Sequence, residues 1–175
     1  EVVEETIKTV TKDIIVSKDY SLFINKYIQS NIIQLSNVEY KKIGDICSIL
    51  SNGIRNSSEG NTTGLYPLYY CSIQGNLWMD TYDYENEESI IINTTNGSGK
   101  CEVYYCNNKY SVAQSTVRFN SKIDDIKTKY IYFYLHSNKI ILEEKFKGSN
   151  QKQLTRKDLL EIQIPIPPLE IQNQI

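Results

Sequence analysis

Apolar and polar residues alternate with two different periods along this chain of 175 residues. In residues 1–16 the apolar side chains recur at helical spacing, at Val3, Ile7, Val10 and Ile14. Spacings of three and four place these side chains on one face of an amphipathic helix. A helix of this length is marginal alone in water, so it needs a surface to pack on. We therefore expect residues 1–39 to form a helix and a connector.

From Tyr40 to about Phe119 the pattern changes to short apolar or aromatic runs separated by Gly, Asn and Ser. Such runs are typical of β-strands joined by turns. A short helical turn is expected within Ile43–Leu50, before the long polar loop Ser51–Gly64. The expected strands are Tyr66–Cys71, Ser89–Asn93, Cys101–Cys106, Tyr110–Ala113 and Thr116–Asn120. The dipeptide Asn96-Gly97 predicts a tight turn between two of them.

The helical period returns after the last of these strands. Lys129–Phe146 predicts one long helix with an apolar face, and the polar loop Lys147–Gln153 follows it. Thr155 is expected to cap the next short helix, because Asp158 stands three residues later in an approximate capping box.

The last residues predict a strand, a corner and a new helix. Ile162–Ile166 alternates as a closing strand does. The prolines that follow fix φ and lack an N–H, so no helix can continue through them. Leu169–Ile175 then begins a new helical stripe. The fold expected is α+β: a twisted, mostly antiparallel sheet with one long helix packed on it, an N-terminal helix and the start of a C-terminal one.

Composition limits the classes of partner that this chain could bind. The formal charge of −2 argues against a wholly basic surface, although a local basic stripe remains compatible with it. The four cysteines show no C-x-x-C spacing and His136 is the only histidine, so we expect no metal site. No signal peptide and no apolar run long enough to span a bilayer are seen, and we expect a cytoplasmic protein.

Catalytic motifs are not found. The run Gly97–Lys100 ends in GK, but a phosphate-binding loop would need glycine at Thr94 and Ser or Thr at Cys101. His136 has no nucleophile motif near it. A solvated loop explains the acidic run Asp80–Glu88 more simply than paired acid and base residues. The residues therefore predict a binding module without catalytic residues.

Three polar loops carry the side chains that nucleic-acid recognition uses. Arg, Asn and Gln pair with base edges, while Lys, Ser and Thr contact phosphates. The candidate DNA-binding residues are Arg55, Asn56, Thr94, Thr95, Asn96, Ser98, Lys100, Lys147, Asn150, Gln151 and Lys152. Ordinary surface loops would have a similar composition, and that alternative stays open at this point.

A series of short motifs in fixed order resembles the target recognition domain of type I restriction–modification specificity subunits. The resemblance covers about 40–175 and places the recognition domain at 40–166 and the start of a conserved spacer helix at 167–175. Its motifs are Tyr40-KKIGDIC, Thr63-GLYPLY, Ser89-IIIN, Gly97-SG, Lys129-YIYFYL, Gly148-SNQ and Ile164-PIPPLEIQ.

A second resemblance lies in Ile15–Ile28, where Asp19-Tyr20 and Ile24–Tyr27 are similar to the tail of N6-adenine DNA methyltransferase subunits. It implies that the natural chain fuses a methyltransferase to its recognition domain. S-adenosylmethionine would then bind to that methyltransferase domain. These residues lack its catalytic and glycine-rich motifs, so we expect neither methyl transfer nor a cofactor here.

The resemblance implies sequence-specific binding of double-stranded DNA in the major groove, while an attached methyltransferase flips out an adenine. The implied partners are DNA and a methyltransferase domain or subunit, with a restriction subunit or a second recognition domain as further candidates. Asp80–Glu88 would face away from DNA or contact cytosine amino groups. The alternative is a protein-interaction module on the same fold that has lost DNA binding.

Overall fold

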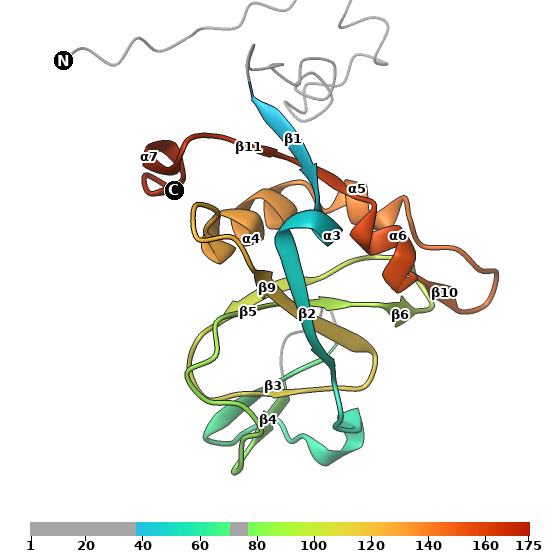
Figure 1. Ribbon diagram of the computed structural model, residues 1–175. Coiled ribbons are helices and arrows are strands. Elements are labelled where there is room, and N and C mark those ends of the chain that lie inside the picture. Colours follow the sequence, from blue (N-terminus) through green and yellow to red (C-terminus); the bar gives the residue numbers. More distant parts are fainter. Residues whose placement is uncertain (1–37, 71–76) are drawn as a thin grey trace, which may run out of the picture. The chain divides into compact units, whose positions relative to one another are not determined.

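The structure is a computed structural model that describes residues 38–70 and 77–175 (Figure 1). Residues 39–175 form one compact unit, and everything below concerns that unit. The predicted N-terminal helix, the methyltransferase-like segment and Cys71 lie outside the described residues.

A four-stranded antiparallel sheet forms the centre of the unit. Its strands are β2 (Cys47–Asn52), β9 (Thr116–Ser121), β5 (Ser89–Asn93) and β7 (Val103–Cys106), in that spatial order. The pairing of β2 with β9 contains a register shift between Ile49 and Ser51. Three of these strands match the expected ones closely, whereas β2 was not expected.

Strand β5 is buried along its whole length because both faces of the sheet are covered. Ile90 and Ile92 join the larger core cluster with the helices, and Ile91 points into a second cluster with Tyr110 and Val112. This alternation follows from the period of two in a strand.

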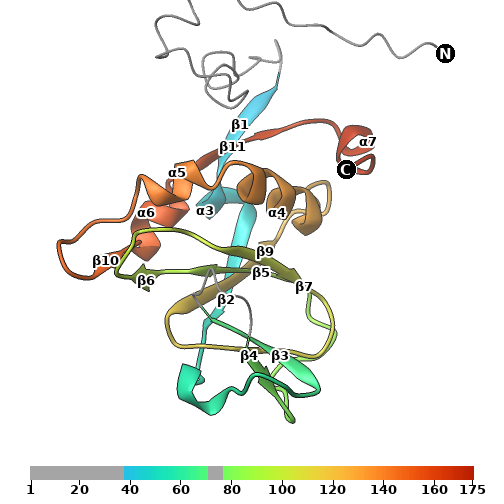
Figure 2. The ribbon, with the colours of Figure 1, turned by 180° about the vertical axis from the view of Figure 1, so that it is seen from behind.

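Helices cover one face of the central sheet, as Figures 1 and 2 show from opposite sides. They are α4 (Thr128–Ser137), α5 (Ile140–Glu143) and α6 (Arg156–Leu160). The predicted long helix is interrupted at Asn138, whose φ of −122° and ψ of 40° leave the helical region. The Asn138 side chain donates to the carbonyl of Tyr134 at 2.8 Å and so helps to end α4.

A smaller, three-stranded sheet lies on the other face. Strand β3 (Tyr66–Tyr69) pairs antiparallel with β4 (Leu77–Met79) and parallel with β8 (Ser111–Val112). The loop before β3 contains the short 3-10 helix η1 (Ser57–Glu59). Leu68 of β3 and Met79 of β4 are buried in a small cluster with Ala113.

The first and last strands of the unit pair with each other. Strand β1 (Glu39–Lys42) pairs antiparallel with β11 (Gln163–Ile166), and α3 (Ile43–Ile46) and α7 (Leu169–Gln172) follow them along the chain. The predicted helical turn and closing strand correspond to α3 and β11. The mixed, mostly antiparallel architecture confirms the expected α+β class.

Candidate nucleic-acid interface

Two of the three predicted polar loops meet through a short strand pair. Strand β6 (Thr95–Asn96) pairs antiparallel with β10 (Lys152–Gln153), in the register Asn96 with Lys152 and Thr95 with Gln153. Figure 1 shows the pair at one edge of the domain, with the loop before β10 projecting beyond it. Residues more than 50 positions apart therefore share one surface, here called the β6–β10 edge.

The side chain of Asn96 organises the turn after β6. Its Oδ1 accepts from the Gly99 N–H at 2.6 Å, and its Nδ2 donates to the Lys100 carbonyl at 2.6 Å. Gly99 has a φ of +72°, and a Cβ there would lie 2.7 Å from the Cδ of Lys152. The chain therefore reverses after Asn96, but through Gly99 and within a longer connection between β5 and β7 than the predicted tight turn at Asn96-Gly97.

The loop Lys147–Gln153 is closed at its base by an antiparallel bridge. Lys147 and Gln153 exchange two backbone hydrogen bonds, of 3.0 and 2.8 Å. Gly148 has a φ of +128°, which suits glycine at the start of the reversal. Asn150 and Gln151 are exposed at the tip. Their amides can therefore reach a partner outside the domain.

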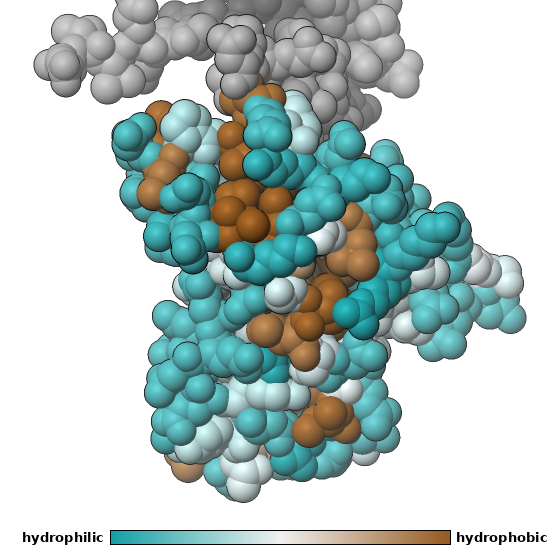
Figure 3. Space-filling view, in the orientation of Figure 1, coloured by the Kyte–Doolittle hydropathy of each residue, from teal (hydrophilic) through white to brown (hydrophobic). Residues whose placement is uncertain are grey.

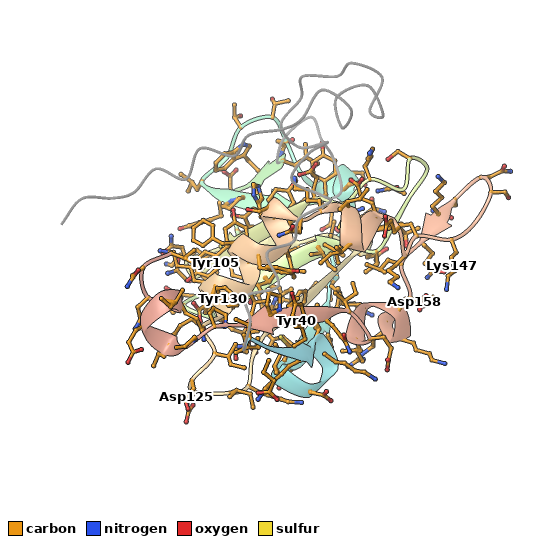
Figure 4. The ribbon with its side chains drawn as sticks, turned by 90° about the horizontal axis from the view of Figure 1, so that it is seen from above. Tyr40, Tyr105, Asp125, Tyr130, Lys147 and Asp158 are labelled. Atoms are coloured by element: carbon orange, nitrogen blue, oxygen red, sulfur yellow. The ribbon has the colours of Figure 1, made fainter. Side chains whose placement is uncertain are left out.

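The helix after this loop begins at the expected residue. Thr155 Oγ1 accepts from the Asp158 N–H at 3.0 Å, which confirms the predicted N-cap of α6. Asp158 also pairs with Lys147 at 3.1 Å. Figure 4 labels both side chains on the side from which the loop projects. The pairing fixes the base of the loop to α6.

Positive charge is in excess on the β6–β10 edge. Lys100 pairs with Glu143 at 3.0 Å, so this predicted phosphate contact already has a carboxylate partner. Within the described part of the chain, no ion pair involves Lys145, Lys152, Arg156 or Lys157. Figure 3 shows this side of the domain as largely hydrophilic. The remaining predicted residues of the edge are Thr94, whose Oγ1 donates to the Ser115 carbonyl, and the exposed Ser98.

Arg55 and Asn56 lie elsewhere, beside η1. Asn56 Oδ1 accepts from the Ser58 N–H at 3.1 Å, and the Glu59 side chain accepts from the Asn56 N–H at 2.7 Å, which completes a capping box. The structure therefore divides the predicted residues into two groups, and the group at η1 sits at the end of the domain formed by β3 and β4 (Figure 1).

Arg55 is held by two carboxylates. Its Nε donates to both oxygens of Asp83 at 3.0 and 2.9 Å, its Nη2 donates to Asp83 Oδ1 at 2.5 Å, and its Nη1 donates to Glu59 at 3.1 Å. The bonds to Asp83, followed by those to Glu59, raise the pKa of Arg55. Burial pushes the pKa of Asp83 upward, but the hydrogen bonds from Arg55 and Ser111 and the positive charge of Arg55 together outweigh burial and lower the pKa overall.

Arg118 is a buried cation that the sequence prediction missed. Its guanidinium carbon lies 3.4 Å from the centroid of the Tyr84 ring and 5.5 Å from that of Tyr110, and it pairs with Glu87. Its side chain is 1% exposed. Arg118 interrupts the apolar residues of β9, and a cation in a buried strand is a signal that a carboxylate or aromatic partner is near.

The acidic run 80–88 is thus fastened at two points, Asp83 to Arg55 and Glu87 to Arg118. The side chain of Asp83 is only 8% exposed, so this residue is not part of a solvated loop.

Among residues 38–70 and 77–175 no helix is long and apolar enough to cross a membrane. The same residues contain no group of three or more His, Cys, Asp or Glu placed to bind a metal ion.

The fold and this arrangement of loops define a DNA specificity domain of restriction–modification systems. The chain belongs to the family described as Type I restriction modification DNA specificity domain, which matches residues 35–175. Curated relatives agree. One is a protein of Mycoplasma pneumoniae named as a type I specificity subunit, 34% identical over 138 residues, which cover 77% of this chain and 37% of that protein. Another, from Haemophilus influenzae, is 25% identical over 161 residues, covering 86% and 39% respectively.

Solved structures show the same fold. The S subunit of a type I restriction-modification system from M. genitalium aligns with a TM-score of 0.64 at 16% identity, over 82% of this chain and 39% of that one. The HsdS subunit from Thermoanaerobacter tengcongensis aligns with a TM-score of 0.56 at 18% identity, over 91% and 42%. The chain therefore spans about two fifths of the length of these relatives.

Proposed function

We propose that this domain binds double-stranded DNA at a specific sequence and so directs an adenine-N6 DNA methyltransferase, within a type I restriction–modification assembly, to its site. The β6–β10 edge carries the proposal. It joins two loops distant in sequence and exposes the amides of Asn150 and Gln151. Lys100 and Lys147 nearby have carboxylate partners, whereas Lys145, Lys152, Arg156 and Lys157 make no ion pair within the described residues.

Charge at this edge favours DNA over the alternative of a protein-interaction module that has lost DNA binding. Residue 100 together with residues 143–158 contain six cations and three carboxylates. Since the whole chain has a net charge of −2, the positive charge is concentrated here rather than spread. Phosphate contacts supply most of the affinity for a duplex, and they depend on local rather than total charge.

The greater length of the relatives bears on which further domains would complete the assembly. A chain spanning about two fifths of a specificity subunit leaves room in those proteins for a second recognition domain. A methyltransferase subunit or domain would bind S-adenosylmethionine and transfer its methyl group to adenine. A restriction subunit would cleave the DNA. The resemblance in Ile15–Ile28 favours a methyltransferase in the same chain.

The test measures duplex binding by the full-length protein assembled with its methyltransferase, across a salt series. We expect log Kd to rise steeply with log salt concentration, and Lys152→Glu to weaken all duplexes and reduce the slope by about 1. Lys129→Glu is the matched control, because Lys129 lies on α4, away from the β6–β10 edge. Salt-independent binding, or equal losses in the two variants, contradicts this placement of the DNA surface.

A further inference from the structure

The guanidinium of Arg55 is preorganised by the protein around it. Its backbone is fixed to β8, since the Arg55 N–H donates to the Val112 carbonyl at 3.1 Å and its carbonyl accepts from the Gln114 N–H at 2.9 Å. The side chain remains 30% exposed, whereas its partner Asp83 is 8% exposed. An exposed fork held by a buried carboxylate loses little side-chain freedom when it binds a partner.

Asp83 is itself held in place. Its backbone N–H donates to the Tyr110 carbonyl at 3.1 Å, and four residues later Glu87 pairs with the buried Arg118. The position of the Arg55 guanidinium therefore depends on contacts to the buried residues Tyr110 and Arg118.

The guanidinium of Arg55 keeps N–H groups that its carboxylate partners do not use. A guanidinium has five N–H groups. The bonds to Asp83 and Glu59 use the one on Nε, one on Nη2 and one on Nη1. One N–H remains on each terminal nitrogen. Two parallel donors on an arginine match the two acceptors, O6 and N7, that guanine presents in the major groove.

Charge argues that this fork contacts a base rather than a phosphate. Arg55 shares its single positive charge with two carboxylates, Asp83 and Glu59. The group as a whole carries one negative charge, so it offers no attraction to a phosphate. A guanine edge is uncharged and needs only donors. The cations of the β6–β10 edge are better suited to phosphates.

We infer that Arg55 reads a guanine in the recognition sequence and that Asp83 is its positioning residue. The inference rests on the proposed function and adds to it a base and the residue that selects it. Glu59 restrains the third edge of the same fork, and Arg118 holds the loop that carries Asp83.

The experiment starts from methylation mapping with the full-length protein and its methyltransferase, which gives the recognised sequence. Each guanine of that sequence is then replaced singly by 7-deazaguanine, which lacks the N7 acceptor, and binding is measured. We expect one position to cost the wild-type complex roughly 10-fold in affinity, because the analogue removes one of the two hydrogen bonds of a bidentate contact. Arg55→Met, which is of similar length but has no N–H to donate, abolishes that penalty. Asp83→Asn reduces it and Asp83→Glu restores part of it.

Lys129→Met is the control, since it makes a similar exchange at an exposed cation on α4, outside the β6–β10 edge, and leaves the 7-deazaguanine penalties unchanged. Thermal unfolding of each variant separates loss of the contact from loss of the fold. A recognised sequence without guanine, or penalties that persist in Arg55→Met, overturns the inference while leaving the proposed function intact. If the wild-type complex prefers no sequence over random duplex, the proposed function itself fails.

Discussion

The backbone N–H of Lys127 donates a hydrogen bond of 2.9 Å to Oε1 of Gln172. The Nε2 of Gln172 donates to the carbonyls of Asp125 and Pro167, at 3.0 and 2.8 Å. Gln172 is 4% exposed, so its side chain connects α7 to the turn before α4 from a buried position.

Replacement of Gln172 by alanine leaves these three backbone groups without their partner. We expect Gln172→Ala to lower the free energy of unfolding by about 1–3 kcal/mol, the cost of unsatisfied buried polar groups. Chemical denaturation measures the loss, and hydrogen exchange locates it at α7. Gln174→Ala is the control, because Gln174 is exposed. Equal stability of the two variants contradicts the anchoring role.

Arg118 is predicted to stabilise the domain through both charge and shape. Arg118→Met removes the cation between Tyr84 and Tyr110 and leaves Glu87, which solvent can reach, without its partner. The substitution should cost about 2 kcal/mol of unfolding free energy, the value of a desolvated cation–π contact. Arg118→Lys keeps the charge but not the planar stacking, so it should recover only part of the loss. Full stability in the lysine variant would show that charge alone matters at this position.

The two glycines of the turn after β6 should respond differently to alanine. At Gly99 the φ of +72° disfavours a side chain, and the new Cβ would meet the Lys152 side chain at 2.7 Å. We expect Gly99→Ala to cost about 1–2 kcal/mol. At Gly97 the nearest heavy atom to a Cβ is the Asn150 carbonyl oxygen at 3.8 Å, so Gly97→Ala should be near neutral. Thermal unfolding of the two variants gives the comparison directly.

Acid should weaken the attachment of the loop that contains Asp83. The pKa of Asp83 in the folded protein lies below its ordinary value of 3.8, so the unfolded chain takes up the proton first as pH falls. The stabilisation is therefore present above that value and disappears as pH falls through the folded pKa. Unfolding free energies measured from neutral to acidic pH should fall more steeply for the wild type than for Asp83→Asn. Parallel curves would mean that the carboxylate contributes nothing.

Local sequence patterns were sufficient to predict the elements that depend only on neighbouring residues. The strand at Ser89–Asn93 and the helix cap at Thr155 depend on neighbours in sequence, and each was found where the sequence predicted it. The chain also reverses after Asn96, although through a longer connection than the tight turn that Asn96-Gly97 predicted. The corner of prolines before α7 belongs to the same group, since proline imposes its own geometry.

Elements that depend on distant partners were not predictable. Strand β2 lacks a regular alternation of apolar and polar residues, and it forms because β9, about 70 positions later, pairs with it. The interruption of the predicted long helix at Asn138 is a different case, because the side chain bonds back to Tyr134 only four residues away; the apolar period that continues across Asn138 concealed it. In the candidate site, the meeting of β6 with β10 and the pairing of Arg55 with Asp83 join segments whose sequences carry no sign of each other. The positions of Asp83 and Arg118 were missed for that reason.

The pairing of β1 with β11 brings the two outer strands of the unit together. Glu39 lies opposite Ile166, so these strands run side by side at about 4.8 Å. A domain whose outer strands are neighbours can be inserted into a longer chain with little disturbance to it. The compact unit continues past β11 to α7, which Gln172 anchors, so a transplant of this domain into another chain would have to carry α7 with it.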